Sequence, residues 1–378
     1  MWFVCICFCC GACEESQSST MTVQDEGVAI LLLADATTYE MQDEADQTHT
    51  MHTQDMGTWS NQDARVWEED QSISVPDQTI VDPLDRDADG ISNGEDNCPD
   101  VYNPSQSDFD RNDMGDACES DADGDGIPDE WDPAPQDASW PGRTLADTVY
   151  AHTAGELYAL DIKSTRPFLI APFTFETDPA LITDIAINRA GVLWAISYDT
   201  IYICHAQEAY CKPQGYLADE NLNGLTFIHG SVYEQEQDVL IGIDEFGTWY
   251  ALSNDGFGGV FNSESIGRYT LGDRSSGDAF YIDEVGTFAS VKRSGEASDV
   301  IVSLDPRRIF LADDLLFLDG YSKVYGLAGW RGLLFAFDES GAILRINLQD
   351  LSFELLGNEG LSWWGAGVSS VLYSTMEE

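Results

Sequence analysis

Positive charge is the scarcest property of this chain. Its 378 residues include 17 Lys and Arg against 68 Asp and Glu, which gives a formal net charge of −51. Such a surface repels phosphate backbones and anionic lipid headgroups, so we expect neither nucleic acid nor an anionic bilayer surface as a partner. Adaptation to a salty habitat would produce the same acidic bias as a specific acidic function.

Long apolar runs are also missing, because no segment reaches the roughly 20 apolar residues that a membrane-spanning helix needs. The amino terminus reads MWFVCICFCCGAC. It resembles a bacterial lipoprotein signal, which implies a signal peptide over residues 1–12, cleavage after Ala12 and a lipid on Cys13. We therefore expect export to the cell envelope, at the outer membrane or cell surface, with membrane contact through that lipid only.

Familiar catalytic motifs are absent as well. The sequence has five histidines and contains no G-x-S-x-G elbow, no H-E-x-x-H pair and no glycine-rich phosphate loop. This favours a protein that is not an enzyme.

What the chain does contain is three acidic loops, DRDADGISNGEDNCP (85–99), DFDRNDMGDACE (108–119) and DADGDGIPDEWD (121–132). Each places oxygen-bearing side chains at loop positions 1, 3, 5 and 12, and the first and third turn on Gly at position 6. Ca²⁺ takes six to eight oxygen ligands, and a loop of this pattern supplies them. The predicted Ca²⁺ ligands, with the residues at position 7 acting through their carbonyls, are Asp85, Asp87, Asp89, Ile91 and Asp96; Asp108, Asp110, Asn112, Met114, Asp116 and Glu119; and Asp121, Asp123, Asp125, Ile127, Asp129 and Asp132.

The acidic segment resembles the thrombospondin type 3 repeat. The D-N-C-P of residues 96–99, the N-P-x-Q of 103–106 and the G-D-x-C of 115–118 stand in that family's order. The resemblance implies an irregular stalk over residues 81–134, wrapped around Ca²⁺ ions with almost no apolar core, and a disulfide between Cys98 and Cys118. The middle loop departs from the pattern at Asp113, which replaces the usual Gly, and at Glu119, which replaces the usual Asp.

Cysteine usage is typical of an exported protein. Four of the nine cysteines lie beyond Cys13, and they fall into two near pairs, Cys98 with Cys118 and Cys204 with Cys211. An even count in local pairs indicates an oxidising compartment. Cys204 and Cys211 would staple two neighbouring strands, or else remain unpaired thiols in the core.

Composition divides the rest of the chain. Residues 13–80 are polar and acidic, without a lasting amphipathic period, and are predicted as a disordered tether. Residues 135–147 are predicted as a linker, and 148–378 as an all-β domain of short alternating apolar stretches. Small-residue starts of an inner strand recur at Asp184, Gly224, Asp278, Gly326 and Gly365.

Two further strands follow each of the first four starts, but none follow Gly365. The missing strands lie at the other end of the domain, at 148–153, 156–162 and 167–173. Pairing the last strand with these closes a ring and removes exposed sheet edges. The predicted fold is therefore a mainly β protein with a five-bladed β-propeller, or six-bladed if the insert 253–276 hides another blade. An open β-sandwich is the alternative.

Two functions compete for the predicted propeller. In the first it recognises a surface ligand, a protein or a glycan, as an adhesion module. In the second it is a hydrolase or lyase with a metal in the central channel, held by carboxylates such as Asp184 and Asp278. Sugar-stacking tryptophans are a related hypothesis, although packing between blades explains them as well; they are Trp194, Trp249, Trp330, Trp363 and Trp364.

Overall fold

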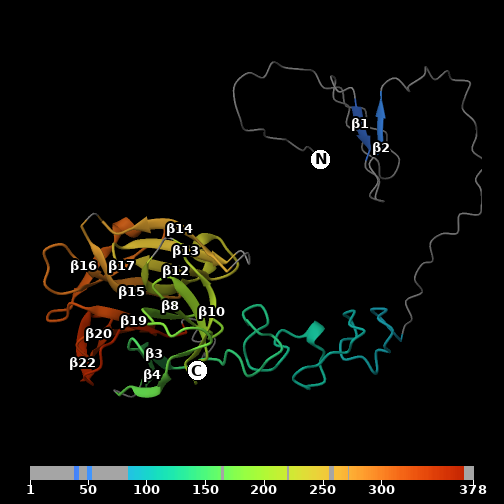
Figure 1. The fold of residues 1–378 in the computed structure, drawn as a ribbon, viewed down its shortest axis with the longest axis horizontal. Helices are drawn as coiled ribbons and strands as arrows, with labels where there is room; N and C mark the ends of the chain where they lie inside the picture. Colours follow the sequence, from blue (N-terminus) through green and yellow to red (C-terminus); the bar gives the residue numbers. More distant parts are fainter. Residues whose placement is uncertain are drawn as a thin grey trace, which may run out of the picture. The chain divides into compact units, whose positions relative to one another are not determined.

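A computed structural model describes residues 84–162, 166–218, 221–254, 259–270 and 272–369, and the backbone of two short strands. These strands, β1 (Thr38–Met41) and β2 (His49–His52), pair antiparallel within the segment predicted as a tether. The predicted signal, Cys13 and the rest of that segment lie outside the described residues. The chain divides into two units, residues 1–79 and 80–378, and the second contains the acidic loops and every strand from β3 onward (Figure 1).

Residues 84–134 form an irregular segment, here called the stalk. Its regular structure among the described residues is one 3-10 turn at Asp116–Cys118. Its buried apolar side chains are Cys98, Ala122 and Ile127. Because so little apolar surface is buried, this segment depends on its polar contacts, as the sequence predicted.

The remainder forms five sheets, each with four antiparallel strands, which are the blades of a β-propeller (Figure 1). The fold class predicted from the sequence is confirmed. Blade 1 contains β7 (Asp184–Ile187), β8 (Leu193–Ser197), β9 (Thr200–Cys204) and β10 (Tyr210–Tyr216), with β6 (Thr174–Phe175) added parallel to β10. Blade 2 contains β11 (Leu222–Ile228), β12 (Val239–Asp244), β13 (Thr248–Asn254) and β14 (Phe261–Arg268). Blade 3 contains β15 (Arg274–Ile282), β16 (Gly286–Lys292), β17 (Val300–Leu304) and β18 (Asp313–Phe317). Blade 4 contains β19 (Val324–Trp330), β20 (Leu333–Asp338), β21 (Ala342–Asn347) and β22 (Ser352–Asn358).

The fifth, closing blade joins both ends of the domain, as predicted. Its strands are β23 (Gly365–Gly367), β3 (Thr148–His152), β4 (Glu156–Asp161) and β5 (Phe168–Pro172), in that order. Gly365 pairs with His152 and Gly367 pairs with Tyr150 across the seam. The inner strand therefore comes from the carboxyl end of the chain and the other three from its beginning.

The insert 253–276 does not add a sixth blade, because β14 within it is the outer strand of blade 2. The sequence analysis missed the outer strands of blades 2 to 4. Strands β14, β18 and β22 are largely exposed or half-buried, so their residues lack the apolar alternation that marked the second and third strands.

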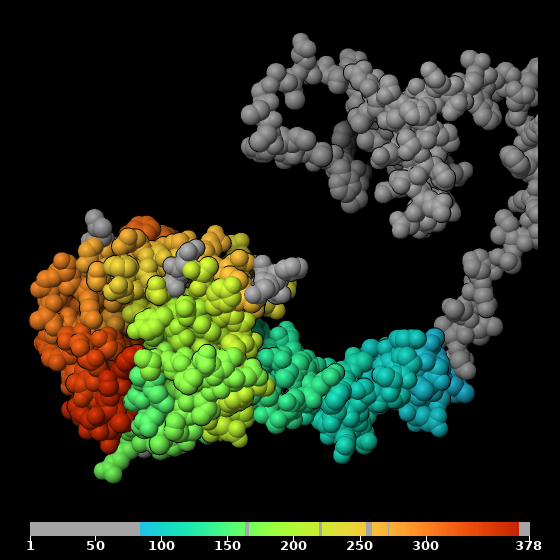
Figure 2. All heavy atoms as spheres, viewed as in Figure 1, coloured from blue at the N-terminus to red at the C-terminus, as the bar shows by residue number. Residues whose placement is uncertain are grey.

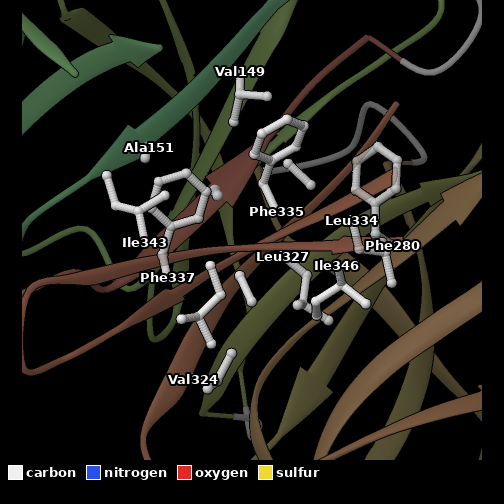
Figure 3. Close-up of a cluster of buried hydrophobic side chains, with 14 of the residues drawn as sticks. Val149, Ala151, Phe280, Val324, Leu327, Leu334, Phe335, Phe337, Ile343 and Ile346 are labelled. Atoms are coloured by element: carbon white, nitrogen blue, oxygen red, sulfur yellow. The ribbon is translucent and has the colours of Figure 1, made fainter. Parts of the chain in front are cut away.

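Apolar side chains fill the space between neighbouring blades. In Figure 3, Phe335 and Phe337 of blade 4 lie among side chains of its neighbours, including Val149 of the closing blade and Phe280 of blade 3. The inner strands approach one another still more closely. A Cβ on Gly224 would lie 2.3 Å from the carbonyl oxygen of Gly277, and one on Gly277 would lie 2.6 Å from Tyr325 Cα. The small residues that recur at the starts of the inner strands thus allow these strands to pack closely.

Candidate functional site

The three acidic loops share one backbone geometry. In each, the carboxylate at position 1 accepts a hydrogen bond from the N–H at position 6: Asp85 from Gly90 (3.1 Å), Asp108 from Asp113 (3.2 Å) and Asp121 from Gly126 (2.9 Å). All three residues at position 6 have positive φ, 97° at Gly90, 73° at Asp113 and 89° at Gly126. This left-handed turn favours glycine, so Asp113 adopts it at a cost.

Position 5 also acts in the same way in each loop. Its side-chain oxygen accepts a hydrogen bond from the N–H at position 7, as in Asp89 to Ile91 (2.8 Å), Asn112 to Met114 (2.7 Å) and Asp125 to Ile127 (2.7 Å). The three loops therefore repeat the same backbone turn in space as well as the same pattern in sequence.

Several carboxylate oxygens at these centres are buried without a hydrogen-bond partner. They are Asp85 Oδ1, Asp87 Oδ2, Asp96 Oδ2, Glu119 Oε1, Asp123 Oδ2, Asp125 Oδ2 and Asp132 Oδ2. Oxygens of Asp85, Asp87 and Asp89 lie within 4.8 Å of one another, as do those of Asp121, Asp123 and Asp125. Buried carboxylates need a partner, and an oxygen-only donor set is the one that Ca²⁺ takes. The first and third loops thus fit the ion.

Electrostatics support the same conclusion. Burial, with repulsion from neighbouring carboxylates, raises the pKa of Asp132 to about 6. The pKa of Asp125 is raised for the same reasons. A bound cation would oppose this repulsion and favour the ionised forms.

The middle loop, which departs from the family pattern at Asp113 and Glu119, is built less tightly than the other two. Asp108, Asp110 and Asn112 are exposed or half-buried, and the Asn112 amide donates to Asp110 (2.8 Å) and Glu119 (2.8 Å) instead of leaving both free. Asp116 Oδ1 accepts from the N–H of Phe109 (2.9 Å), and Asp129 Oδ1 accepts equivalently from Ala122 (2.9 Å) in the third loop. The residues at position 9 thus brace their loops.

Both predicted disulfides are present in the structure. Cys98 is bonded to Cys118 and crosses from the first loop to the second. Cys204 is bonded to Cys211 between the paired strands β9 and β10 of blade 1. The alternative of free core thiols at Cys204 and Cys211 is therefore not what the structure contains.

The third loop packs directly on blade 1. Ile127 is fully buried in a cluster with Trp140, Ala190, Val192 and Ile203. In Figure 2 the teal atoms at the carboxyl end of the stalk adjoin the green atoms of this blade. Ile127 therefore connects the two parts of the protein: its carbonyl is a predicted Ca²⁺ ligand, and its side chain packs against blade 1.

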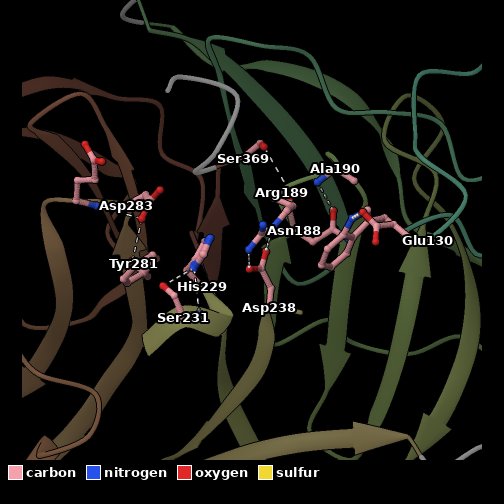
Figure 4. Close-up of polar contacts among 12 residues, drawn as sticks. Glu130, Asn188, Arg189, Ala190, His229, Ser231, Asp238, Tyr281, Asp283 and Ser369 are labelled. Atoms are coloured by element: carbon pink, nitrogen blue, oxygen red, sulfur yellow. Dashed lines mark hydrogen bonds and ion pairs between the residues drawn. The ribbon is translucent and has the colours of Figure 1, made fainter. Parts of the chain in front are cut away.

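Polar contacts extend this junction. The Arg189 guanidinium lies 5.2 Å from the ring centre of Trp131, near the end of the third loop, and forms an ion pair with Asp238 of blade 2 (Figure 4). The predicted linker, residues 135–147, lies on blade 1 as well, where Lys212 Nζ stands 3.9 Å from the ring centre of the buried Trp140. This segment fastens the stalk to the blade.

A cavity of about 550 Å³ opens where the inner strands of all five blades begin. Its lining residues include those just before, or near the start of, the inner strands. They are Thr183, Tyr198, Asn221, Asn223, Glu245, Arg274, Ser275, Ser276, Gly277, Lys292, Tyr325, Glu339 and Trp364. The lining combines aromatic rings with amides and hydroxyls, and its two acidic and two basic side chains balance. In so acidic a chain, this is a distinctive surface.

Beneath this cavity three titratable groups lie buried in the channel. Asp184 and Asp278, both predicted there, are 0% and 1% exposed, and His152, which the sequence analysis did not select, is 0% exposed. Burial raises the pKa of both carboxyls and lowers the pKa of His152 to about 4, so its ring is neutral. None of the three lines the cavity itself.

The five tryptophans predicted as sugar-stacking candidates include residues of the core and one residue that lines the cavity. Trp249 and Trp363 are fully buried between blades. Trp194 and Trp330 are half-buried against the core. Only Trp364, among these five, lines the cavity. Packing therefore accounts for four of them.

Comparison with known proteins identifies the stalk. Residues 83–106 and 107–139 match the family Thrombospondin type 3 repeat, so the stalk consists of repeats of this family. A segment of 41 residues is 56% identical to Cartilage oligomeric matrix protein of Mus musculus and covers 11% of this chain. The chain spans 5% of the length of that relative.

Solved structures similar to the propeller are distant. One is a structural genomics protein of unknown function from Bacteroides thetaiotaomicron, 9% identical, covering 56% of this chain and 55% of that chain with a TM-score of 0.39. Another is an oligogalacturonate lyase in complex with manganese, 10% identical, covering 55% of this chain and 61% of that chain with a TM-score of 0.30. The assignment of the fold rests instead on the five sheets and their closed ring. Within the described residues, no helix combines the length and apolar character needed to cross a membrane.

Proposed function

We propose that this is an exported calcium-binding surface protein whose stalk presents the propeller to a polar ligand, with Cys13 carrying the lipid that anchors it. The observation that carries the proposal is the placement of Ile127: its side chain is buried against blade 1, while its carbonyl stands at the predicted ligand position 7 of the third loop. Ca²⁺ in that loop would fix both the stalk and its attachment. The two disulfides and the thrombospondin type 3 repeats support an extracellular setting.

The cavity supports a glycan as the ligand. Its volume of about 550 Å³ suits a small molecule or a short saccharide. A protein partner would need a broad contact surface of roughly 800 Å² on each side. The exposed ring of Tyr198 and the half-buried rings of Tyr325 and Trp364 lie beside amides and hydroxyls, which matches the apolar faces and hydroxyl groups of sugar rings. The balanced charge of the lining favours a neutral ligand.

A glycan array probed with this chain, with and without Ca²⁺, tests the proposal. Tyr198 lines the cavity and is 47% exposed, so Tyr198→Ala should weaken binding at least tenfold. Tyr102 in the stalk is 66% exposed, and Tyr102→Ala is the matched control that should bind normally. Absence of any glycan ligand, or equal binding by both variants, would refute recognition at this cavity.

Catalysis is the second candidate, because His152, Asp184 and Asp278 converge beneath the cavity. A hydrolase or lyase with a channel metal would need such groups within reach of substrate. All three are buried below the residues that line the cavity, which supports binding over turnover. Release of shorter saccharides from a bound glycan, lost in Asp184→Asn, would establish the enzyme instead.

A further inference from the structure

Three buried side chains from three different blades meet in the propeller channel. Asp184 is the first residue of β7 in blade 1, Asp278 lies on β15 in blade 3, and His152 ends β3 in the closing blade. Each is at least nine-tenths buried. Side chains of this kind need partners in a protein interior.

His152 presents an unprotonated nitrogen to Asp184. Its Nδ1 lies 2.9 Å from the carbonyl oxygen of Thr153, so Nδ1 carries the hydrogen and donates it, while Nε2 has no partner. A Cβ placed on Gly365 would lie 2.4 Å from His152 Nε2 and 2.1 Å from Asp184 Oδ1. These two atoms therefore face one small space, which exists because residue 365 has no side chain.

The two carboxyls offer further acceptors to the same region. Asp184 accepts hydrogen bonds from the N–H groups of Ile185 (2.8 Å) and Leu225 (2.6 Å). Asp278 Oδ2 accepts from Leu327 (2.7 Å), whereas its Oδ1 has no partner apart from the Asp184 carboxyl beside it. No Lys or Arg among the described residues forms an ion pair with either.

We propose that one divalent transition-metal ion, of the Zn²⁺ or Mn²⁺ class, binds between His152, Asp184 and Asp278 and ties together blades 1, 3 and 5. The imidazole nitrogen and the carboxylate oxygens are all hydrogen-bond acceptors, so a cation or a proton must lie between them to offset their repulsion. A neutral imidazole whose other nitrogen donates to a backbone carbonyl is the usual form of a metal-bound histidine. The nitrogen donor distinguishes this site from the oxygen-only calcium loops.

A proton shared between the two carboxyls is the competing occupant. It would satisfy Asp278 and Asp184 but would leave His152 Nε2 without a partner. Among the described residues, the trios whose ligand atoms already lie within 4.8 Å of one another are those of the stalk. His152, Asp184 and Asp278 would therefore have to move closer together to bind the ion. Because the bound ion would connect three blades, it should raise the melting temperature.

The test uses the whole chain kept in saturating Ca²⁺, so that the stalk loops are filled. Transition metals are first removed with a chelator that leaves Ca²⁺ in place. Binding of Zn²⁺ and of Mn²⁺ is then measured by calorimetry, and the metal content of the protein is measured by mass spectrometry. We expect one equivalent, a rise in melting temperature, and at least a tenfold loss of affinity in His152→Gln and Asp278→Asn. His229→Gln is the matched control, since His229 is half-buried and its Nδ1 contacts the hydroxyl of Ser231.

A measurement on the unaltered protein guards against variants that do not fold. Electron spin echo spectroscopy of the Mn²⁺-loaded chain should show coupling to one imidazole nitrogen, and residues 84–134 contain no histidine that could supply it. Failure to bind one equivalent of either metal, a Mn²⁺ signal without nitrogen, or unchanged binding in His152→Gln would overturn the proposal. A pH-dependent stability without metal uptake would identify the shared proton instead.

Discussion

Replacing Ile127 by Ala should separate calcium binding from attachment of the stalk. The change leaves the backbone carbonyl at position 7 in place, so the third loop keeps all of its predicted ligands. It removes three carbons from a side chain that is 0% exposed among Trp140, Ala190 and Val192. Buried Ile-to-Ala changes cost about 2–5 kcal/mol, from lost burial and from the cavity left behind.

This loss of free energy should weaken the contact between the third loop and blade 1 and leave the propeller itself unaffected, because Ile127 belongs to none of the apolar clusters between blades. A cost of about 3 kcal/mol would weaken docking of the loop by roughly 100-fold. The assay is amide hydrogen exchange in residues 135–147 and in β8, with and without Ca²⁺. In the unaltered chain we expect Ca²⁺ to slow exchange in both segments.

In Ile127→Ala the calcium stoichiometry from calorimetry should be unchanged while this protection disappears. Met114 occupies position 7 of the second loop and is 46% exposed, so Met114→Ala is the matched control and should keep the protection. If Ile127→Ala is protected by Ca²⁺ as fully as the unaltered chain, the stalk and propeller are not coupled through this residue.

Three further predictions concern the loops, the channel and the seam. Asp89→Ala and Asp125→Ala should each weaken Ca²⁺ binding in calorimetry, and no uptake by the unaltered chain at millimolar Ca²⁺ would contradict the calcium assignment. Gly224→Ala should lower stability by about 1–3 kcal/mol, because its Cβ would lie 2.3 Å from a backbone carbonyl oxygen, whereas Gly155→Ala has no atom within 4 Å and should be neutral in denaturant unfolding. Truncation after Gly360 removes β23 and should give aggregated or protease-sensitive protein; a truncated chain with the original melting temperature would show that closure is dispensable.

Most of the second and third strands of the blades were predictable because they are largely buried, and their sequences are therefore rich in apolar residues. The segments 238–244 and 332–338, for instance, became β12 and β20 within a residue or two. Outer strands such as β14 were missed because water replaces a neighbouring blade on one side. The residues of the outer strands show little apolar alternation, so the sequence does not mark them as strands. They form strands because they pair with the neighbouring strand of the blade.

The channel was predictable only in part. Asp184 and Asp278 were found because each stands at or near the start of an inner strand, a position that repeats along the sequence. His152 stands in the second strand of the closing blade, and it reaches the channel because its partner across the seam is Gly365. That juxtaposition depends on the ring closing, which brings together residues more than two hundred positions apart, and no local pattern records it.

The contact between the stalk and blade 1 was also not predictable from a local sequence pattern, as two isoleucines in equivalent positions show. Ile91 and Ile127 both occupy position 7 of a loop with the sequence D-x-D-x-D-G-I or D-x-D-G-D-G-I, and both N–H groups bond to the carboxylate two residues before. Only Ile127 lies in the cluster with blade 1, because the third loop is followed within a few residues by Trp140 and then by β3. The same loop chemistry therefore leaves Ile91 half-buried in the first loop and places Ile127 against blade 1 in the third. Under the proposed function, Ca²⁺ would strengthen the attachment only at the third loop, because that loop leads directly to the first strand of the ring.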